Sequence, residues 1–140
     1  MSSSERYLLD TSALFTFFEG EAGFERVRQV LRQAPTLICA VSLMEVHYLT
    51  IREHDQAKAD WRHALLKRSG AEILWELDEP LVLQAAGLKA GYPLSLADAL
   101  IAASALRHGA ILMHKDPEYD ALTGFVQQER LPSKPSASAF

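Results

Sequence analysis

Two patterns of apolar residues alternate along the chain. Short runs in which almost every residue is apolar favour buried strands, whereas apolar residues spaced three or four apart favour helices with one buried face. The predicted strands are residues 6–10, 36–41, 71–78 and 110–114, with a weaker fifth at 124–128. The predicted helices are one through Leu14 and Phe18, followed by 21–34, 42–53, 55–70, 79–91 and 95–108.

Residues that start or stop helices agree with these boundaries. Pro35 follows the second helix, and Gly70 and Gly91 suit the ends of later ones. Apolar strands that alternate with helices indicate a parallel sheet buried on both faces. The predicted fold class is therefore α/β, a three-layer α/β/α domain with a central parallel sheet of four to five short strands.

The length and composition fit one domain. The chain has 140 residues, of which 49% are hydrophobic, and this is enough for one full core with little room for a second. We expect residues 1–130 to form the domain. Pro, Ser and Ala dominate residues 131–140, so we expect a loosely ordered C-terminal tail there.

The sequence favours a cytoplasmic protein. No apolar run is long enough to span a membrane, and the N-terminus lacks a basic stretch followed by an apolar one, so we expect neither a membrane anchor nor a signal peptide. Cys39 is the only cysteine and lies in an apolar run, which favours a buried thiol over a nucleophile. We therefore expect a reducing compartment.

Four acidic residues follow strands or begin helices in the predicted fold. Asp10 ends the first strand, Glu45 lies near the start of the helix after the second, and Asp116 follows the fourth. Asp98 lies in the first turn of the helix that leads into the fourth strand. Chain direction alone places the first three at the carboxyl edge of the sheet, where open parallel sheets bind ligands. Asp98 joins them if its helix starts at the same edge, as right-handed winding requires.

Each acid also has a purely structural explanation. Glu45 and Asp98 stand three residues after Ser42 and Ser95, the spacing of a capping box. Asp10 and Asp116 fit turn positions, the latter before Pro117. Taken singly, Glu45 and Asp98 are better explained as caps. The convergence of four acids is what favours a functional site.

Carboxylates gathered at one edge require protons or cations. Two unit charges ~4 Å apart repel by about 4 kcal/mol at an effective dielectric constant of 20. Oxygen ligands without paired Cys or His favour Mg²⁺ or Mn²⁺, and such ions activate water for phosphodiester hydrolysis. The formal net charge of −4 argues against broad binding of nucleic acids, but a bound metal reverses the local sign and keeps a nuclease open.

Four motifs carry a resemblance to a known family. In chain order they are YLLDTSAL, VSLMEV, LSLADALIAASAL and GAILMHKDPEYDAL, and together they span nearly the whole chain. Their order and spacing resemble those of the PIN-domain ribonucleases and, within them, the VapC-like toxins of type II toxin–antitoxin pairs.

The resemblance implies roles for individual residues. Asp10, Glu45, Asp98 and Asp116 match the family's four acidic positions. Asp10, Asp98 and Asp116 would hold the metal, and Glu45 would help to bind metal or orient the attacking water. Thr11 and Ser12 would supply hydroxyls that position the substrate.

The resemblance also implies partners. They are a single-stranded or structured RNA, often a tRNA or ribosomal RNA, a small cognate antitoxin, and a second copy of the chain in a homodimer. Two residues depart from the family pattern: His114 stands where Thr or Ser is usual, and Glu118 adds a carboxylate that we interpret as a solvated loop acid.

Two other functions compete with the ribonuclease. A non-catalytic PIN-like binding module would use the acids only as caps and turns. A surface patch of Phe15, Phe17 and Phe18 with Tyr48 and Leu49 would suit such a module, although local packing explains the same residues. An aspartyl-phosphate phosphatase ranks last, because the stretch after Asp10 lacks its second acid.

Overall fold

The chain was analysed as a computed structural model, in which residues 5–133 are described. Five strands form the sheet: β1 (Tyr7–Leu9), β2 (Thr36–Cys39), β3 (Glu72–Leu74), β4 (Ile111–His114) and β5 (Gln128–Arg130). The α-helices are α1 (Thr11–Glu19), α2 (Phe24–Gln33), α3 (Ala40–Glu53), α4 (Gln56–Arg68), α5 (Glu79–Gly91) and α6 (Leu96–His108). A 3-10 helix, η1 (Pro117–Leu122), follows β4.

All neighbouring strands are parallel, in the order β3-β2-β1-β4-β5. From β1 the chain adds strands in one direction as far as β3 and then crosses back to add β4 and β5 on the other side. Strand order therefore reverses between β1 and β4. In open parallel sheets, this switch point at the carboxyl ends of the strands is where ligands bind.

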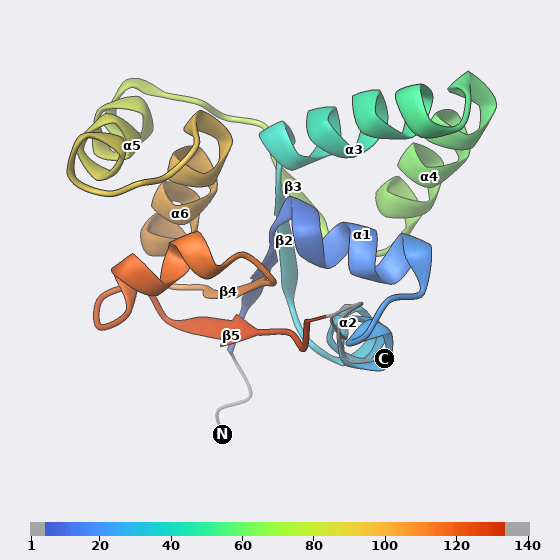
Figure 1. The fold of residues 1–140 in the computed structure, drawn as a ribbon, viewed down its shortest axis with the longest axis horizontal. Helices are drawn as coiled ribbons and strands as arrows, with labels where there is room; N and C mark the ends of the chain where they lie inside the picture. Colours follow the sequence, from blue (N-terminus) through green and yellow to red (C-terminus); the bar gives the residue numbers. More distant parts are fainter. Residues whose placement is uncertain (1–4, 134–140) are drawn as a thin grey trace, which may run out of the picture.

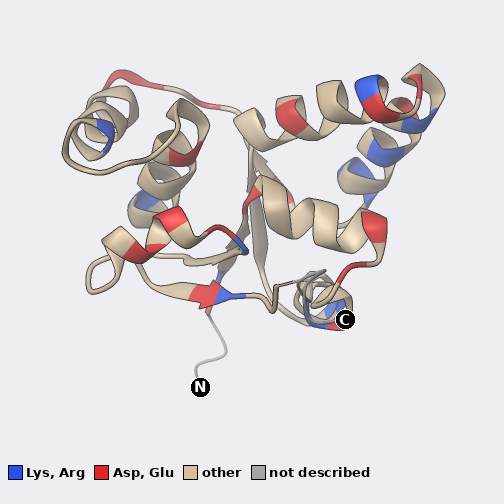
Figure 2. Cartoon of the chain, viewed as in Figure 1, with Lys and Arg blue, Asp and Glu red and all other residues tan. Residues whose placement is uncertain are grey.

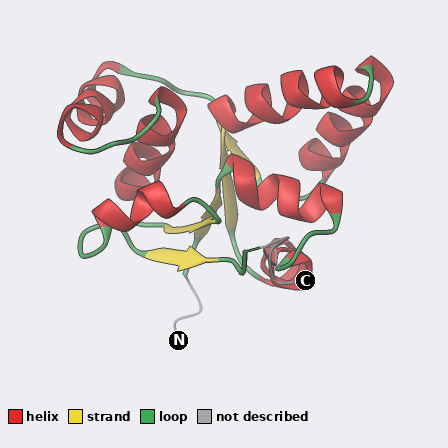
Figure 3. Cartoon of the chain, in the orientation of Figure 1, coloured by secondary structure: helices red, strands yellow, loops and turns green. Residues whose placement is uncertain are grey.

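Helices cover both faces of the sheet (Figures 1 and 3). Adjacent strand residues point to opposite faces, and each central strand uses this to supply both cores. Leu8 and Leu112 pack with α5, α6 and η1, whereas Leu9 and Met113 pack with α1, α2 and α3. These four side chains are fully buried. The predicted three-layer α/β/α class is confirmed.

The fifth strand lies later in the chain than predicted. Residues 124–128 were expected to form it, but β5 begins at Gln128. Gly124 has φ +107°, and the backbone amides of Phe125 and Val126 both bond the carbonyl of Leu122. The predicted stretch is therefore mostly a turn that closes η1 before the chain becomes extended.

Helix α3 begins earlier than predicted. The apolar run 36–41 was assigned to a strand, but the strand ends at Cys39 and the helix starts at Ala40. Ser42 is then inside the helix rather than at its cap. The capping box predicted for Ser42 and Glu45 is wrong, because Glu45 lies in the second turn.

The aromatic residues of α1 pack inward. Phe15, Phe17 and Phe18 are half-buried against the core between the sheet and helices α1–α3. The ring of Phe17 stacks on that of Phe24 with centroids 5.5 Å apart. Local packing therefore accounts for the three phenylalanines, and they do not form an exposed patch.

The domain extends past residue 130. Leu131 was assigned to the tail, yet it is buried and its backbone amide bonds the carbonyl of His114. The rest of the predicted tail falls largely on residues 134–140, outside the described residues. Within residues 5–133, no helix has the length and apolar character needed to cross a bilayer.

Candidate active site

Acidic residues meet at the switch point of the sheet. Asp10 directly follows β1, and Asp116 follows the neighbouring strand β4 by two residues. Asp98 lies in the first turn of α6, which begins at the same edge. Figure 2 shows acidic positions on both sides of the upper end of the sheet, whereas many basic positions lie on α4 and the far end of α3.

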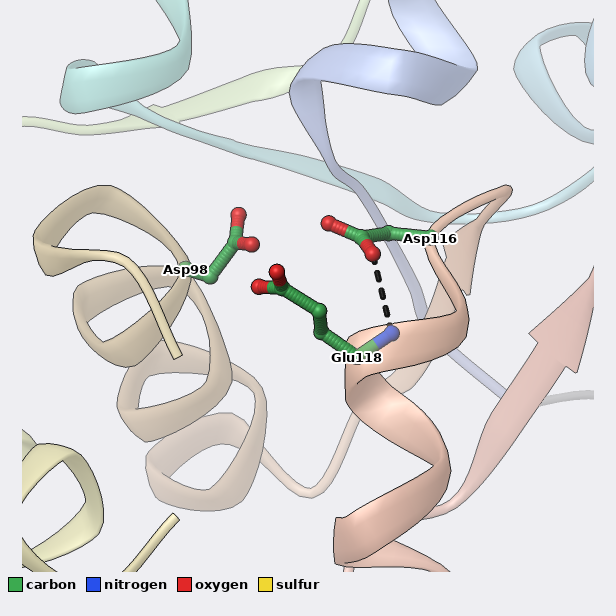
Figure 4. A group of neighbouring side chains, drawn as sticks. All are labelled: Asp98, Asp116 and Glu118. Carbon is green, nitrogen blue, oxygen red and sulfur yellow. Dashed lines mark hydrogen bonds between the residues drawn. The ribbon is translucent and has the colours of Figure 1, made fainter. Parts of the chain in front are cut away.

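Three carboxylates converge at this edge (Figure 4). One oxygen from each of Asp98, Asp116 and Glu118 lies within 4.8 Å of the others. Asp98 comes from α6, whose N-terminus is capped by the Ser95 hydroxyl. Asp116 caps η1 by accepting a hydrogen bond from the Glu118 amide at 2.9 Å. Asp98 and Asp116 are half-buried and Glu118 is exposed, so the group opens to solvent on one side.

Asp10 lies buried behind this group. Its Oδ1 accepts hydrogen bonds from the Ser12 hydroxyl at 2.7 Å and from the Ala13 amide at 2.8 Å, and so caps α1. Only 2% of the residue is exposed. Burial raises the pKa of Asp10 to about 7, and the negative charges of Asp98 and Asp116 act in the same direction.

Asp98 is also hard to ionise. Its pKa is raised to about 6, first by burial and then by a hydrogen bond with the neighbouring Asp116 carboxyl. The Tyr119 hydroxyl donates to Asp98 Oδ1 at 3.0 Å and opposes this shift. Burial is the largest cause for both residues, and neighbouring acidic side chains raise both pKa values further.

No basic side chain among the described residues neutralises the acids of this edge. Within residues 5–133, none of Asp10, Asp98, Asp116 and Glu118 forms an ion pair. Lys115 adjoins Asp116 but turns its Nζ to Glu21, 3.3 Å away. The donor set is therefore oxygen alone, with uncompensated negative charge, and it fits a hard divalent cation such as Mg²⁺ or Mn²⁺.

Glu45 does not belong to the group of three converging acids. Its carboxylate accepts the hydroxyl proton of Thr11 at 2.5 Å, and Thr11 Oγ1 also lies 3.2 Å from the Ser42 hydroxyl. Because the side chain does not cap its own helix, capping fails to explain this acid. It is linked instead to the residue directly after Asp10.

The Ser12 hydroxyl makes two hydrogen bonds, one as donor and one as acceptor. It donates to Asp10 and accepts the backbone amide proton of Lys115 at 2.9 Å, so its hydroxyl joins the ends of β1 and β4. The role of Thr11 and Ser12 in positioning a substrate stays a prediction. What the structure establishes is that both hydroxyls orient acidic side chains.

Sequence reasoning missed two residues. Glu118 was interpreted as a solvated acid, yet its carboxylate joins those of Asp98 and Asp116. The available signal was its position two residues after Asp116, within one turn of a 3-10 helix. Tyr119 was not singled out at all, although its buried hydroxyl contacts Asp98.

The fold and the acidic edge define an α/β protein whose candidate site lies at the switch point of a parallel sheet. A family model described as the PIN domain matches residues 7–124. The chain therefore belongs to the PIN domain family. A search of curated protein sequences gives no match.

Solved structures share this fold. A chain of the VapBC2 structure from Rickettsia felis, determined with a fragment of promoter DNA, matches with a TM-score of 0.73 at 15% identity, covering 91% of this chain and 99% of that one. VapBC-1 from nontypeable Haemophilus influenzae matches with 0.70 at 22% identity, covering 89% and 97%. VapC20 from Mycobacterium tuberculosis, described as a toxin that cleaves the sarcin–ricin loop, matches with 0.69 at 19% identity, covering 86% and 97%.

Proposed function

We propose that this chain is a Mg²⁺- or Mn²⁺-dependent endoribonuclease and the toxin of a toxin–antitoxin pair. The observation that carries the proposal is the convergence of Asp98, Asp116 and Glu118, with ligand atoms within 4.8 Å and no cationic partner among the described residues. Membership of the PIN domain family and the likeness to VapBC structures support the same function.

Each acid has a task in this proposal. Asp98, Asp116 and Glu118 would bind the ion. The buried Asp10, which interacts electrostatically with Asp98 and Asp116, would add a further negative charge to the site. Glu45, held by Thr11, contributes to metal binding or orients the attacking water. A bound divalent cation would help water to attack near neutral pH and would offset the charge of the phosphodiester.

RNA is the proposed substrate, either a tRNA or a ribosomal RNA. The description of VapC20 as a sarcin–ricin loop toxin supports including ribosomal RNA among the substrates to test. The overall charge of −4 predicts weak non-specific binding, so selectivity would come from the shape of the target rather than from a broadly basic surface.

The proposed partners are a small cognate antitoxin and a second copy of this chain, in the cytoplasm. Likeness to chains from VapBC structures supports the antitoxin. Co-expression with a candidate antitoxin, a small protein if one is encoded beside this chain, followed by purification through a tag on one of them, tests the pair. Light scattering of the purified chain tests the homodimer.

The decisive experiment is cleavage of a pool of tRNA and ribosomal RNA with Mn²⁺ and with EDTA. Asp10→Asn and Asp98→Asn are the variants, because Asn keeps the shape of each side chain and removes its charge. We expect discrete fragments from the wild type with Mn²⁺, and a loss of cleavage of at least 100-fold in both variants.

Asp55→Asn is the matched control. Asp55 caps α4 by accepting the Lys58 amide, just as Asp10 caps α1, but it stands away from the acidic edge. Asn caps a helix nearly as well as Asp, so this variant should cleave like the wild type. If no chain cleaves RNA and Mn²⁺ does not raise the melting temperature, the non-catalytic PIN-like binding module becomes the better explanation.

A further inference from the structure

A continuous path of hydrogen bonds links two residues of the acidic edge. Tyr119 donates its hydroxyl to Asp98 at 3.0 Å, and its carbonyl accepts the side-chain amide of Gln128 at 2.8 Å. Gln128 Oε1 lies 2.8 Å from His114 Nε2. His114 Nδ1 lies 3.0 Å from the backbone amide of Asp116. The path therefore begins at one carboxylate residue of the site and ends at another.

The direction of every bond in this path is fixed. The Asp116 amide can only donate, so His114 Nδ1 must be the acceptor and the ring proton lies on Nε2. Nε2 then donates to Gln128 Oε1, and the amide nitrogen of Gln128 is left to face the carbonyl of Tyr119. Only a neutral His114 with its proton on Nε2 satisfies all four contacts.

The path lies in the core rather than on the surface. His114 and Tyr119 are both fully buried, and their rings pack edge to face with centroids 4.7 Å apart. Buried polar groups destabilise a fold unless they are paired, and apolar side chains would fill the same volume without that requirement. Packing therefore does not explain why this part of the core is polar. The contacts that the path makes with Asp98 and Asp116 at its two ends do explain it.

At each end, the path fixes a part of the acidic site. The Tyr119 hydroxyl engages Oδ1 of Asp98, which orients the carboxylate and leaves capacity on its oxygens for an ion. His114 holds the backbone amide of Asp116. That places the carboxylate of Asp116, which is held in turn by the Glu118 amide.

We propose that Tyr119, His114 and Gln128 are positioning residues that hold Asp98 and Asp116 in the geometry that binds a divalent cation. This inference rests on the metal site of the proposed function. Partners that orient metal ligands in this way change metal affinity by about 10- to 100-fold when they are lost. These residues would set the affinity for metal without touching the RNA or the ion.

The test is direct binding of Mn²⁺, measured by electron paramagnetic resonance of the free ion. Tyr119→Phe removes the hydroxyl and keeps the ring that packs on His114. We expect Mn²⁺ to bind about 10-fold more weakly, while the metal-free variant melts close to the wild type. In RNA cleavage at a fixed subsaturating Mn²⁺ concentration, kcat should fall and KM for RNA should stay unchanged.

Tyr92→Phe is the matched control, because it also removes a phenol hydroxyl, from a ring that lies beside Phe125 with centroids 5.7 Å apart. It should bind Mn²⁺ like the wild type. A second pair of variants tests the other end of the path. His114→Asn keeps an acceptor for the Asp116 amide and His114→Leu does not, so the Asn variant should retain more affinity for Mn²⁺.

The outcomes separate this inference from the proposed function. If the wild type binds Mn²⁺ and Tyr119→Phe binds it equally well, the positioning role is wrong and the metal site stands. Equal affinities in His114→Asn and His114→Leu would contradict the role of His114 in the same way. If the wild type does not bind Mn²⁺, the metal site fails, and the positioning role fails with it.

Discussion

Thr11 donates its hydroxyl proton to Glu45 across 2.5 Å, and this bond joins the first turn of α1 to α3. Both helices pack on the same face of the sheet, and Thr11 directly follows Asp10 in the chain. A short bond between a hydroxyl and a carboxylate is among the stronger hydrogen bonds in proteins. Glu45 therefore has a fixed orientation before any ligand arrives.

Replacing Thr11 tests this relationship. Thr11→Val keeps the shape of the side chain but leaves Glu45 without its donor. A hydrogen bond to a charged group contributes about 1.5–3 kcal/mol, so we expect RNA cleavage to fall by at least about 10-fold, which corresponds to about 1.4 kcal/mol. Thr11→Ser keeps the hydroxyl and should remain near the wild-type rate. Initial rates at saturating RNA provide the measurement. A Val variant as active as the Ser variant would show that Glu45 needs no fixed orientation.

Ser12 is the second hydroxyl to test, because it joins the ends of two strands. Ser12→Ala removes the donor to Asp10 and the acceptor for the Lys115 amide. We expect a loss of about 1–3 kcal/mol in the free energy of unfolding, together with weaker Mn²⁺ binding. Urea unfolding and Mn²⁺ titration measure the two effects.

Ser69→Ala is the control for that experiment. The Ser69 hydroxyl bonds the carbonyl of Leu66 and the amide of Ala71 at the end of α4, far from the acids. It should lose stability and leave Mn²⁺ binding unchanged. A loss of metal affinity in both variants would mean that stability alone, rather than the link from Asp10 to Lys115, controls binding.

The sequence was sufficient to place Asp10 and Asp116. Each follows a strongly apolar strand, and chain direction in a parallel sheet brings the carboxyl ends of strands to one edge. Asp98 required one further assumption, that its helix runs antiparallel to the strands, and the structure agrees. The fold and three of the four acidic positions were therefore predictable from short-range patterns.

The remaining parts of the site depend on contacts that patterns do not encode. The run 36–41 is apolar throughout, so periodicity cannot locate the boundary between strand and helix at Cys39, and Glu45 was placed one turn too early. The direction of Glu118 depends on η1, whose Tyr119 is anchored in the core. Tyr119 is held there by tertiary contacts, among them the hydrogen bond of its hydroxyl to Asp98 on α6.

Ionisation of the buried Asp10 should make the metal-free protein less stable as the pH rises. Its pKa is about 7 in the fold against 3.8 ordinarily, so folding takes up a proton between these values, and the stability gained is lost as the pH passes 7. Between pH 6.5 and 8.5, with EDTA present, we expect the free energy of unfolding to fall by about 1 kcal/mol. Asp98 adds the same trend at lower pH, where its pKa is about 6.

The window limits the opposing contribution of His114, which is half-protonated in the unfolded chain at about pH 6.5. Burial lowers the pKa of His114, so its protonation destabilises the fold as the pH falls below about 6.5, the ordinary value for histidine. Urea unfolding at pH 6.5 and 8.5 is the measurement. Asp10→Asn should abolish the change and Asp55→Asn should preserve it. A change that persists in Asp10→Asn would assign it to another group.

Arg62 links the helices that stand behind α1. The residue is 1% exposed. Its guanidinium bonds the Thr50 hydroxyl at 3.1 Å, pairs with Glu19 and lies 5.1 Å from the centre of the Phe18 ring. One atom of the group, Nε, has no hydrogen-bond partner among residues 5–133. A buried cation with an unsatisfied atom is costly, so its remaining contacts must compensate for that cost.

Removing Arg62 alone should therefore be severe. Arg62→Leu leaves the Thr50 hydroxyl buried without its donor and Glu19 without its cation, and we expect a loss of roughly 3 kcal/mol in the free energy of unfolding. Arg28→Leu, which breaks an exposed pair with Glu25, should cost no more than about 0.5 kcal/mol. Arg62 contacts the end of α1 opposite to Asp10, so Mn²⁺ affinity of the folded variant should match the wild type. A fall in that affinity would show that the α4 contact also sets the geometry of the acidic edge.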